Sequence, residues 1–246
     1  MKKTASSHQH IAVPRPGAHG RPQKRAEQRR AVDTRRAILN AALLEFAEKG
    51  FDAASIRAIA ERTGFQHPLI TYHFRSKDIL WRATAEYAFG QIREEWDGLD
   101  ESDAGMSPLD RLRAEYRTVF KYTVAFPELH RFMRQECNTN SPRLKWVAKT
   151  VLMPLINRLL PQIAALQKAG QLPHMEPIVF HYMMIGLTAT LSEFGPEMDV
   201  TSKLAADDPG IVKSYWRTVE KMVFRTSSSD SDIDVLTLRI PSPNRR

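Results

Sequence analysis

The sequence predicts an all-α protein, and three observations support this fold class. Apolar residues recur at spacings of three and four from Asp33 to Phe224, which is the period of an amphipathic helix. Serine, proline and glycine residues divide this stretch at positions where helices begin and end. No alternation of apolar and polar residues indicates a β-strand within it. The sequence therefore predicts a succession of helices, in a chain long enough for one large domain or two smaller ones.

Capping residues divide the first third of the chain into four helices. Glycine ends a helix because it adopts the left-handed conformation without strain, and a serine side chain accepts hydrogen bonds from the first free amides. Proline fits the first turn, where its missing N–H group has no partner. The first helix is predicted to end at Gly50, and a second to run from Ser55 to Gly64. A third covers roughly Pro68 to Phe74, and Ser76 caps a long fourth helix.

The same signals predict longer helices in the rest of the chain. Helix starts are expected at Ser107-Pro108, Pro127, Ser141-Pro142, Pro177 and Asp208-Pro209. The helix after Ser141 must bend or break near Pro154 and Pro161, and Gly170 closes it. Residues Ile178 to Leu191 are apolar on nearly every side, so this helix is expected to be buried on two sides.

Composition limits the class of protein. The chain contains 42% hydrophobic and 26% charged residues, which is typical of a folded globular protein. No run of about 18 apolar residues could span a bilayer, and the first residues do not form the apolar core of a signal peptide. The single cysteine, Cys137, cannot form an intramolecular disulfide, which fits a reducing compartment. We therefore expect a cytoplasmic protein with no membrane partner.

The net charge of +8 is concentrated near the N-terminus. Eight basic residues precede Val32 against a single acid, Glu27: Lys2, Lys3, Arg15, Arg21, Lys24, Arg25, Arg29 and Arg30. Because this stretch has too few apolar residues to fold alone, residues 1–32 are expected to be a flexible basic arm. The arm is either an electrostatic attachment to phosphate groups or a solvated tail. A second flexible segment is expected at residues 226–246, which are rich in serine and aspartate.

Two short helices joined by a turn at Gly64 match a helix-turn-helix. Residues Ser55 to Leu80 read SIRAIAERTGFQHPLITYHFRSKDIL, which closely resembles the signature of the tetracycline-repressor-like (TetR) family of transcription regulators. The resemblance is densest from Ile59 to Lys77. It implies a three-helix DNA-binding domain over residues 33–80 and a larger helical ligand-binding and dimerisation domain over residues 81–225.

The resemblance also implies which residues contact DNA. They are Ser55, Arg57, Gln66, His67, Leu69, Thr71, Tyr72, His73 and Lys77. The first residues of the recognition helix, Gln66 to Leu69, face base edges in the major groove, with Gln66 and His67 as the readers. Tyr72, His73 and Lys77 stand where the family contacts phosphates, which set the register without reading sequence.

Several of these assignments have a structural alternative. Ser55 is a phosphate ligand at a helix N-terminus or only an N-cap, and both roles are compatible. Arg57 contacts DNA or is solvated, and Tyr72 contacts a phosphate or packs in the core. The family usually has small residues at the positions of Phe65 and Gln66 and a tyrosine at that of Thr71, so its base preference does not carry over.

Aromatic and methionine side chains of the larger domain are candidates for a small-molecule pocket. The pocket candidates are Tyr116, Phe120, Phe132, Met133, Trp146 and Tyr182. Each of them also fits an ordinary helical core, but the resemblance implies a cavity for an effector that the sequence does not identify. No cofactor is expected.

The last two helices are expected to form a homodimer through an intermolecular four-helix bundle, in which Gly186 allows close backbone approach. The interface candidates are Phe180, Met184, Leu187, Tyr215, Val219 and Met222. Two DNA-binding domains about 34–36 Å apart would reach successive major grooves of a pseudo-palindromic operator. An effector that prefers another conformation of the larger domain would weaken this binding, so a repressor released by its ligand is expected.

Two other classes of protein are less favoured. An enzyme would need a catalytic motif, and we find no nucleophile elbow, glycine-rich phosphate loop or paired-histidine zinc motif, so no catalytic residue is assigned. His8, His10 and His19 lack acidic or cysteine partners, so no metal site is expected. A structural DNA-binding protein without an effector stays open, and it would lack a pocket.

Overall fold

The computed structural model describes residues 20–102, 105–137 and 141–224. Most of these residues are helical and no β-strand occurs within these ranges, so the predicted all-α class is confirmed. The chain divides into two units, residues 1–36 and residues 37–246.

Helix α1 (Gly20–Ala53) begins in the first unit and continues into the second. The sequence assigns residues 20–32 to a flexible arm, whereas they form the first turns of this helix. The reason is that arginine, glutamine, lysine and alanine, which dominate there, favour a helix even without an apolar stripe. One turn later, Arg36 forms an exposed ion pair with Asp33 at 3.2 Å. Residues 1–19 of the predicted arm and the predicted tail at 226–246 lie outside the described residues.

The head, residues 37–76, consists of the second half of α1 with helices α2 (Ile56–Thr63) and α3 (His67–Phe74). Gly50, with φ +72°, interrupts α1 where the sequence predicts a helix end. Gly64, with φ +70°, closes α2, as predicted. The core of the head contains Ile38, Phe46, Ile59, Ile70 and Phe74, each at most 2% exposed.

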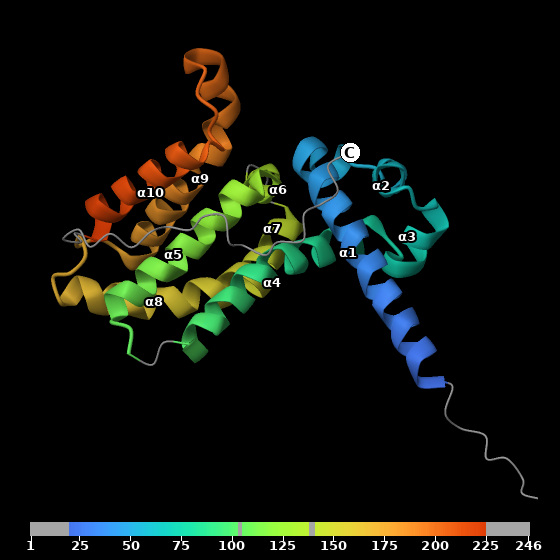
Figure 1. The fold of residues 1–246 in the computed structure, drawn as a ribbon, viewed down its shortest axis with the longest axis horizontal. Helices are drawn as coiled ribbons and strands as arrows, with labels where there is room; N and C mark the ends of the chain where they lie inside the picture. The colour runs from blue at the N-terminus through green and yellow to red at the C-terminus, as the bar shows by residue number, and fades with distance from the viewer. Residues whose placement is uncertain (1–19, 103–104, 138–140, 225–246) are drawn as a thin grey trace, which may run out of the picture. The chain divides into compact units, whose positions relative to one another are not determined.

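The body, residues 77–224, contains the remaining helices (Figure 1). They are α4 (Lys77–Ser102), α5 (Pro108–Ala125), α6 (Pro127–Cys137), α7 (Pro142–Val147), the π-helical turn η1 (Ala148–Leu152), α8 (Met153–Lys168), α9 (Pro177–Ser202) and α10 (Pro209–Phe224). Helix α5 is central, because it packs against α4, α6, α8, α9 and α10.

Proline shapes the segment between α7 and α8. The π-helical turn η1 lies directly before the start of α8, where Pro154 has no N–H group to continue the regular hydrogen-bond pattern. Pro161 lies inside α8 without ending it, and Gly170, with φ +69°, follows the helix. The bend that the sequence predicts near Pro154 is therefore a widened helical turn.

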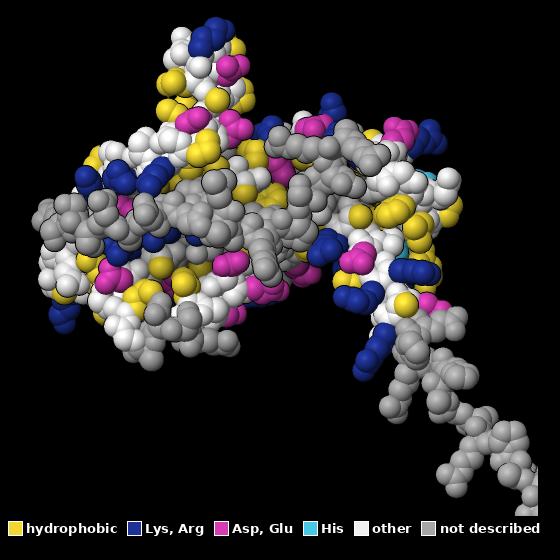
Figure 2. Space-filling view, viewed as in Figure 1, with side chains coloured by type: hydrophobic (Ala, Val, Ile, Leu, Met, Phe, Trp, Pro, Cys, Tyr) yellow, Lys and Arg dark blue, Asp and Glu magenta, His cyan; other side chains and the backbone are white. Residues whose placement is uncertain are grey.

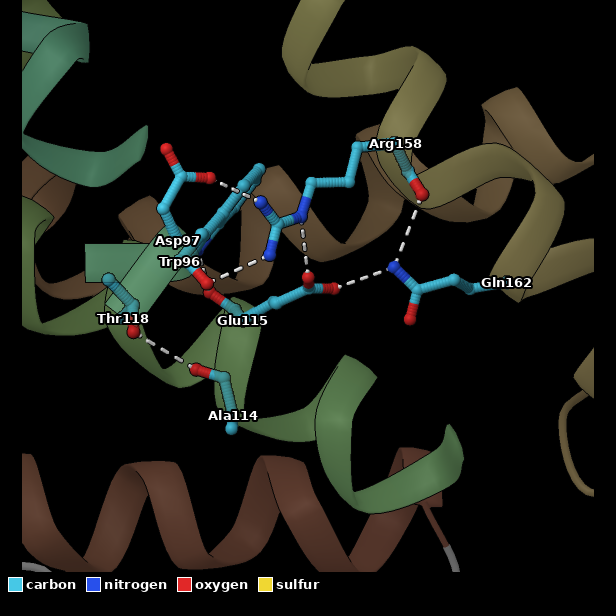
Figure 3. Close-up of polar contacts among 7 residues, drawn as sticks. All are labelled: Trp96, Asp97, Ala114, Glu115, Thr118, Arg158 and Gln162. Carbon is cyan, nitrogen blue, oxygen red and sulfur yellow. Dashed lines mark hydrogen bonds and ion pairs between the residues drawn. The ribbon is translucent and has the colours of Figure 1, made fainter. Parts of the chain in front are cut away.

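A buried carboxylate joins three helices of the body (Figure 3). The side chain of Glu115 is 1% exposed, and it accepts hydrogen bonds from Arg158 Nε at 2.9 Å and Gln162 Nε2 at 3.0 Å. Arg158 also binds the Asp97 carboxylate and the Trp96 carbonyl, each at 2.8 Å. Burial raises the pKa of Glu115, and the Arg158 guanidinium opposes that shift by stabilising the charged form.

Candidate nucleic-acid interface

The first turn of α2 presents a hydroxyl group and an arginine at the surface. Ser55 Oγ caps the helix by accepting hydrogen bonds from the backbone amides of Arg57 at 3.1 Å and Ala58 at 3.4 Å. An oxygen that accepts these bonds can still donate its own proton, for example to a phosphate held by the helix dipole. The capping role is confirmed, and the phosphate contacts of Ser55 and of the exposed Arg57 stay predictions.

Helix α3 has one buried face and one exposed face. Ile70 is 0% exposed and Phe74 is 2% exposed. The exposed residues include the predicted DNA contacts Gln66, His67, Leu69, Thr71 and Tyr72. Gln66 is the N-cap residue, but its side chain makes no capping hydrogen bond, so its amide group is available for a base edge. The residues predicted to read bases therefore share the outward start of this helix.

Tyr72 lies at the surface of the head. Its side chain is 81% exposed, and its ring meets His73 edge-on with the ring centroids 5.5 Å apart. This exposure excludes the alternative that Tyr72 packs in the core. Its phosphate contact stays a prediction.

Lys77 is engaged within the protein. Its Nζ donates to the carbonyl oxygens of Asp52 at 3.0 Å and Ala54 at 3.1 Å, and it lies 4.7 Å from the centroid of the Phe51 ring. The ammonium group therefore ties the turn between α1 and α2 to the start of α4. Its phosphate contact stays a prediction, but a substitution of Lys77 must also affect the stability of the head.

The sequence analysis missed an ion-pair network that holds α1 against α2. The Glu45 side chain is 5% exposed, and it accepts from Arg62 Nε at 3.1 Å and from the Ser55 backbone amide at 3.4 Å. Arg62 also pairs with Glu48. The only signal in the sequence is a carboxylate beside the apolar stripe that contains Phe46, where a buried charge needs a partner.

Helices α6 and α7 connect the body to the head. Gln135 Nε2 donates to the carbonyl oxygen of Ala47 at 3.2 Å. The Arg143 guanidinium lies 3.7 Å from the centroid of the Phe51 ring. Phe132 of α6 packs against aromatic rings of both α1 and α4. Helix α6 therefore contacts α1, the helix that packs beneath the predicted DNA-binding residues.

The pocket candidates fall into separate groups. Tyr116 and Phe120, at most 1% exposed, pack against aromatic residues of α9 and α10. Phe132 and Trp146 pack instead on Trp81 of α4. Met133 is partly buried, whereas the Tyr182 side chain is 56% exposed on the outside of α9. Tyr182 therefore does not line an interior pocket of its own chain, because its side of the helix faces solvent.

A groove of about 280 Å³ lies between α4 and the η1–α8 segment. It is lined by Glu86, Phe89, Gly90, Arg93, Thr150, Val151 and Leu155. A Cβ atom on Gly90 would meet no other atom within 4 Å, so the space beside this lining residue is open. None of the pocket candidates from the sequence lines this groove. A pattern of aromatic residues could not predict the groove, because Phe89 is its only aromatic lining residue.

Three of the interface candidates lie in the core of their own chain. Phe180 and Met184 are 0% exposed and Val219 is 4% exposed, so these side chains are not available to a second copy. The opposite side of α9 carries Val179 and Tyr182, which are 55% and 56% exposed. A helix that is apolar on two sides has one core face, and the predicted interface residues Phe180 and Met184 lie on that face.

The other interface candidates are at or near the surface. Met222 is 71% exposed, and Leu187 and Tyr215 are partly buried. The Tyr215 hydroxyl donates to the Leu187 carbonyl oxygen at 2.6 Å. A Cβ atom on Gly186 would meet nothing within 4 Å, so the outward side of α9 is open to close approach by another helix.

Among the described residues, no group of three or more histidine, cysteine or acidic side chains could hold a metal ion. His8, His10 and His19 lie outside this part of the chain. Within the same part, no helix combines the length and the apolar character needed to cross a membrane.

Comparison with known proteins places the head in a family. Residues 38–84 match the family described as bacterial regulatory proteins, tetR family. The HTH-type transcriptional regulator RutR of Escherichia coli (strain K12) is 25% identical over 196 residues, which cover 79% of this chain and 91% of RutR.

Two solved structures show a similar fold. The transcriptional regulator SCO4942 from Streptomyces coelicolor has a TM-score of 0.58 at 23% identity, over 78% of this chain and 99% of that one. FadR from Bacillus subtilis, in complex with stearoyl-CoA, has a TM-score of 0.56 at 16% identity, over 74% of this chain and 96% of that one. At these identities the likeness concerns the fold alone.

Proposed function

Because the chain belongs to the TetR family of bacterial transcription regulators, we propose that it binds a pseudo-palindromic operator as a homodimer and is released by a small molecule. This proposal rests on one observation, the exposure of the first side chains of α3. Gln66 and His67 are exposed there, while Ile70 and Phe74 hold the helix from beneath. An exposed recognition helix on a rigid support is what reading of base edges requires.

The two proposed readers differ in chemistry. The Gln66 amide can donate and accept at once, which matches the paired groups of adenine in the major groove. The His67 imidazole can donate or accept, so it can distinguish base pairs. Tyr72 and the first turn of α2 would hold the neighbouring phosphates and fix the register.

We propose that the outward sides of α9 and α10 form the dimer interface. Val179 and Tyr182 on α9 and Met222 on α10 are all more than half exposed, although they are large and apolar. Gly186 lies on the same side of α9 and lets a second helix approach closely. Burial of these side chains between two copies would remove their apolar surface from water and set the spacing of the heads.

We propose that the effector acts on α4 and α6. The groove between α4 and η1 begins at Glu86, nine residues after Lys77 at the head, or about 14 Å along the helix. A molecule that widens the groove would shift α4, and the contacts of Phe132 and Gln135 would carry the shift to α1. FadR, with a similar fold, is in complex with stearoyl-CoA, which supports a small-molecule effector for this chain.

The test is to select fragments of genomic DNA bound by the full chain and to measure affinity for the enriched site by fluorescence anisotropy. We expect a two-fold related sequence whose affinity falls when either half-site is scrambled. Compounds suggested by the genes beside that site are then titrated into the complex. Enrichment without a common sequence would contradict the operator proposal, and an operator complex that no compound weakens would favour a structural DNA-binding protein.

A further inference from the structure

The end of α9 and the segment that returns from it form a projection from the body, residues 193–206, which we call the α9 arm. Helix α9 has 26 residues whereas α10 has 16, and Figure 1 shows the last turns of α9 extending past its neighbours. Lys203, with φ +58°, ends the helix and reverses the chain. The return segment packs against the helix at Gly195, where a Cβ atom would lie 3.1 Å from Ala206 Cβ.

The arm carries apolar side chains in solvent. Phe194 is 50% exposed, Val200 is 72% exposed and Leu204 is 46% exposed. By contrast, Leu191, one turn before Phe194, is only 5% exposed. The helical part of the arm, residues 193–202, is about three turns long, and a segment of that length has little stability of its own in water. An exposed apolar end of this kind therefore indicates a surface that is covered in the functional state.

The arm continues the outward side of α9. Val200 follows Tyr182 by 18 residues, which is five turns and about 27 Å of a regular helix, so both side chains are on the same side of α9, which continues through Pro196. A second copy that packs on Tyr182 and Gly186 therefore also reaches the side of α9 that carries Val200. Continuity along one face of one helix favours a second copy of this chain over any other occupant.

The distribution of charged residues also favours a second copy of this chain as the partner of the arm. The arm exposes two carboxylates, Glu197 and Asp199, against one lysine, Lys203, and this excess of negative charge disfavours DNA and anionic lipid as partners. Helix α10 carries Lys213, Arg217 and Lys221 at intervals of four residues, and Figure 2 shows a row of basic side chains along this helix. In a two-fold symmetric dimer, an acidic arm that meets a basic α10 does so twice.

We propose that the α9 arm crosses onto α10 of a second copy and clamps the dimer. This inference rests on the proposed dimer, but it assigns a further contact. Val200 and Leu204 lie against the second copy, and Glu197, which is on the same side of α9 as Val200, faces its basic row. The clamp restrains the two bodies against each other, and thereby the distance between the heads.

The first test measures the dimer dissociation constant by sedimentation velocity. We expect Val200→Glu with Leu204→Glu to raise it at least tenfold, and Met153→Glu, an equally drastic change at a half-exposed position of α8, to leave it unchanged. Helix content should stay at the wild-type level in both variants, because these side chains lie outside the core. An unchanged dissociation constant in the arm variant, with Tyr182→Glu dissociating the dimer, would overturn the clamp and leave the dimer standing.

The second test exchanges the charges. One variant carries Glu197→Lys, and the other carries Lys221→Glu. Each alone should form a weaker dimer, because arm and α10 then repel each other. A mixture of the two should form a heterodimer about as tight as wild type, because both arm contacts are again between opposite charges. No preference for the heterodimer would overturn the proposed partner surface, and a monomeric wild type would overturn the dimer and the clamp together.

Discussion

The head and the body differ in how well the local sequence pattern of a helix indicates which of its side chains are exposed. In the head, the residues that the sequence singles out for base reading, Gln66 and His67, are exposed at the start of α3. In the body, Phe180 and Met184, which the sequence singles out for a dimer interface, have no exposed surface. The comparison teaches that a short helix with a single apolar face reveals its outward side, whereas a helix with two apolar faces does not.

The largest effect is expected when a glutamate is introduced on the buried side of α9 in one variant and on the exposed side in another. Met184→Glu places a carboxylate in the core, which costs several kcal/mol against a total stability of about 5–15 kcal/mol, so we expect a largely unfolded chain. Tyr182→Glu should keep its helix content and dissociate the dimer. Circular dichroism and sedimentation velocity measure both properties. A folded monomer from Met184→Glu together with a stable dimer from Tyr182→Glu would reverse our assignment of the two faces.

The buried carboxylate of the body gives the next largest effect. Arg158→Ala leaves Glu115 without its cationic partner and should cost about 3–5 kcal/mol. The pKa of Glu115 would then rise further above its ordinary value. A carboxyl group with a raised pKa in the folded state favours folding at low pH and loses that contribution as the pH rises through the raised pKa. The deficit relative to wild type should therefore be smaller at pH 5 than at pH 7.

Urea denaturation of wild type, Arg158→Ala and Arg158→Lys at the two pH values measures this effect. The lysine variant retains a positive charge, so we expect a smaller deficit with a weaker pH dependence. Equal deficits of the alanine variant at pH 5 and pH 7 would show that Arg158 acts through its packing on Trp96 rather than through Glu115.

The same contrast explains how much the sequence could predict. Helix boundaries at Ser55, Ser107 and Pro127 are confirmed, because a cap depends on neighbours within three or four residues. The networks around Glu45 and Glu115 were missed, because their arginine partners are 17 and 43 residues away along the chain. Such pairs depend on how helices pack, which the period of a single helix does not specify.

The function of the head is therefore more predictable than that of the body. The Ser55 cap and the exposed start of α3 are both local features, and the structure shows them where the sequence places them. The groove at Gly90 is formed by α4 and η1, which are about 60 residues apart, and no local pattern joins them. The α9 arm was predictable only in part, because the sequence shows its apolar residues but not that they are exposed.

Two variants should distinguish base reading from phosphate binding in the head. His67→Ala should cost about 1–3 kcal/mol on the best operator and relax the preference at one base position in each half-site. Lys77→Ala should lower affinity by a similar factor on every operator, because phosphate contacts carry no sequence information. It should also lower the melting temperature, because the ammonium group binds the carbonyl groups of Asp52 and Ala54.

A library of operators with single base changes measures these profiles. If the His67→Ala profile runs parallel to that of wild type, Gln66, Arg57 or DNA shape performs the reading instead. If Lys77→Ala is less stable but binds every operator as tightly as wild type, the lysine only joins the head to α4.

The smallest expected effect decides between the two roles of Ser55. Ser55→Ala removes the N-cap and should cost about 1 kcal/mol of stability, whereas Ser55→Asp and Ser55→Thr keep a capping oxygen. If a phosphate lies at this helix end, the aspartate repels it, so Ser55→Asp should fold as well as wild type yet bind DNA more weakly. Ser55→Thr, which retains the hydroxyl group, should match wild type in both properties. Wild-type DNA affinity in a stable Ser55→Asp variant would show that Ser55 acts only as a cap.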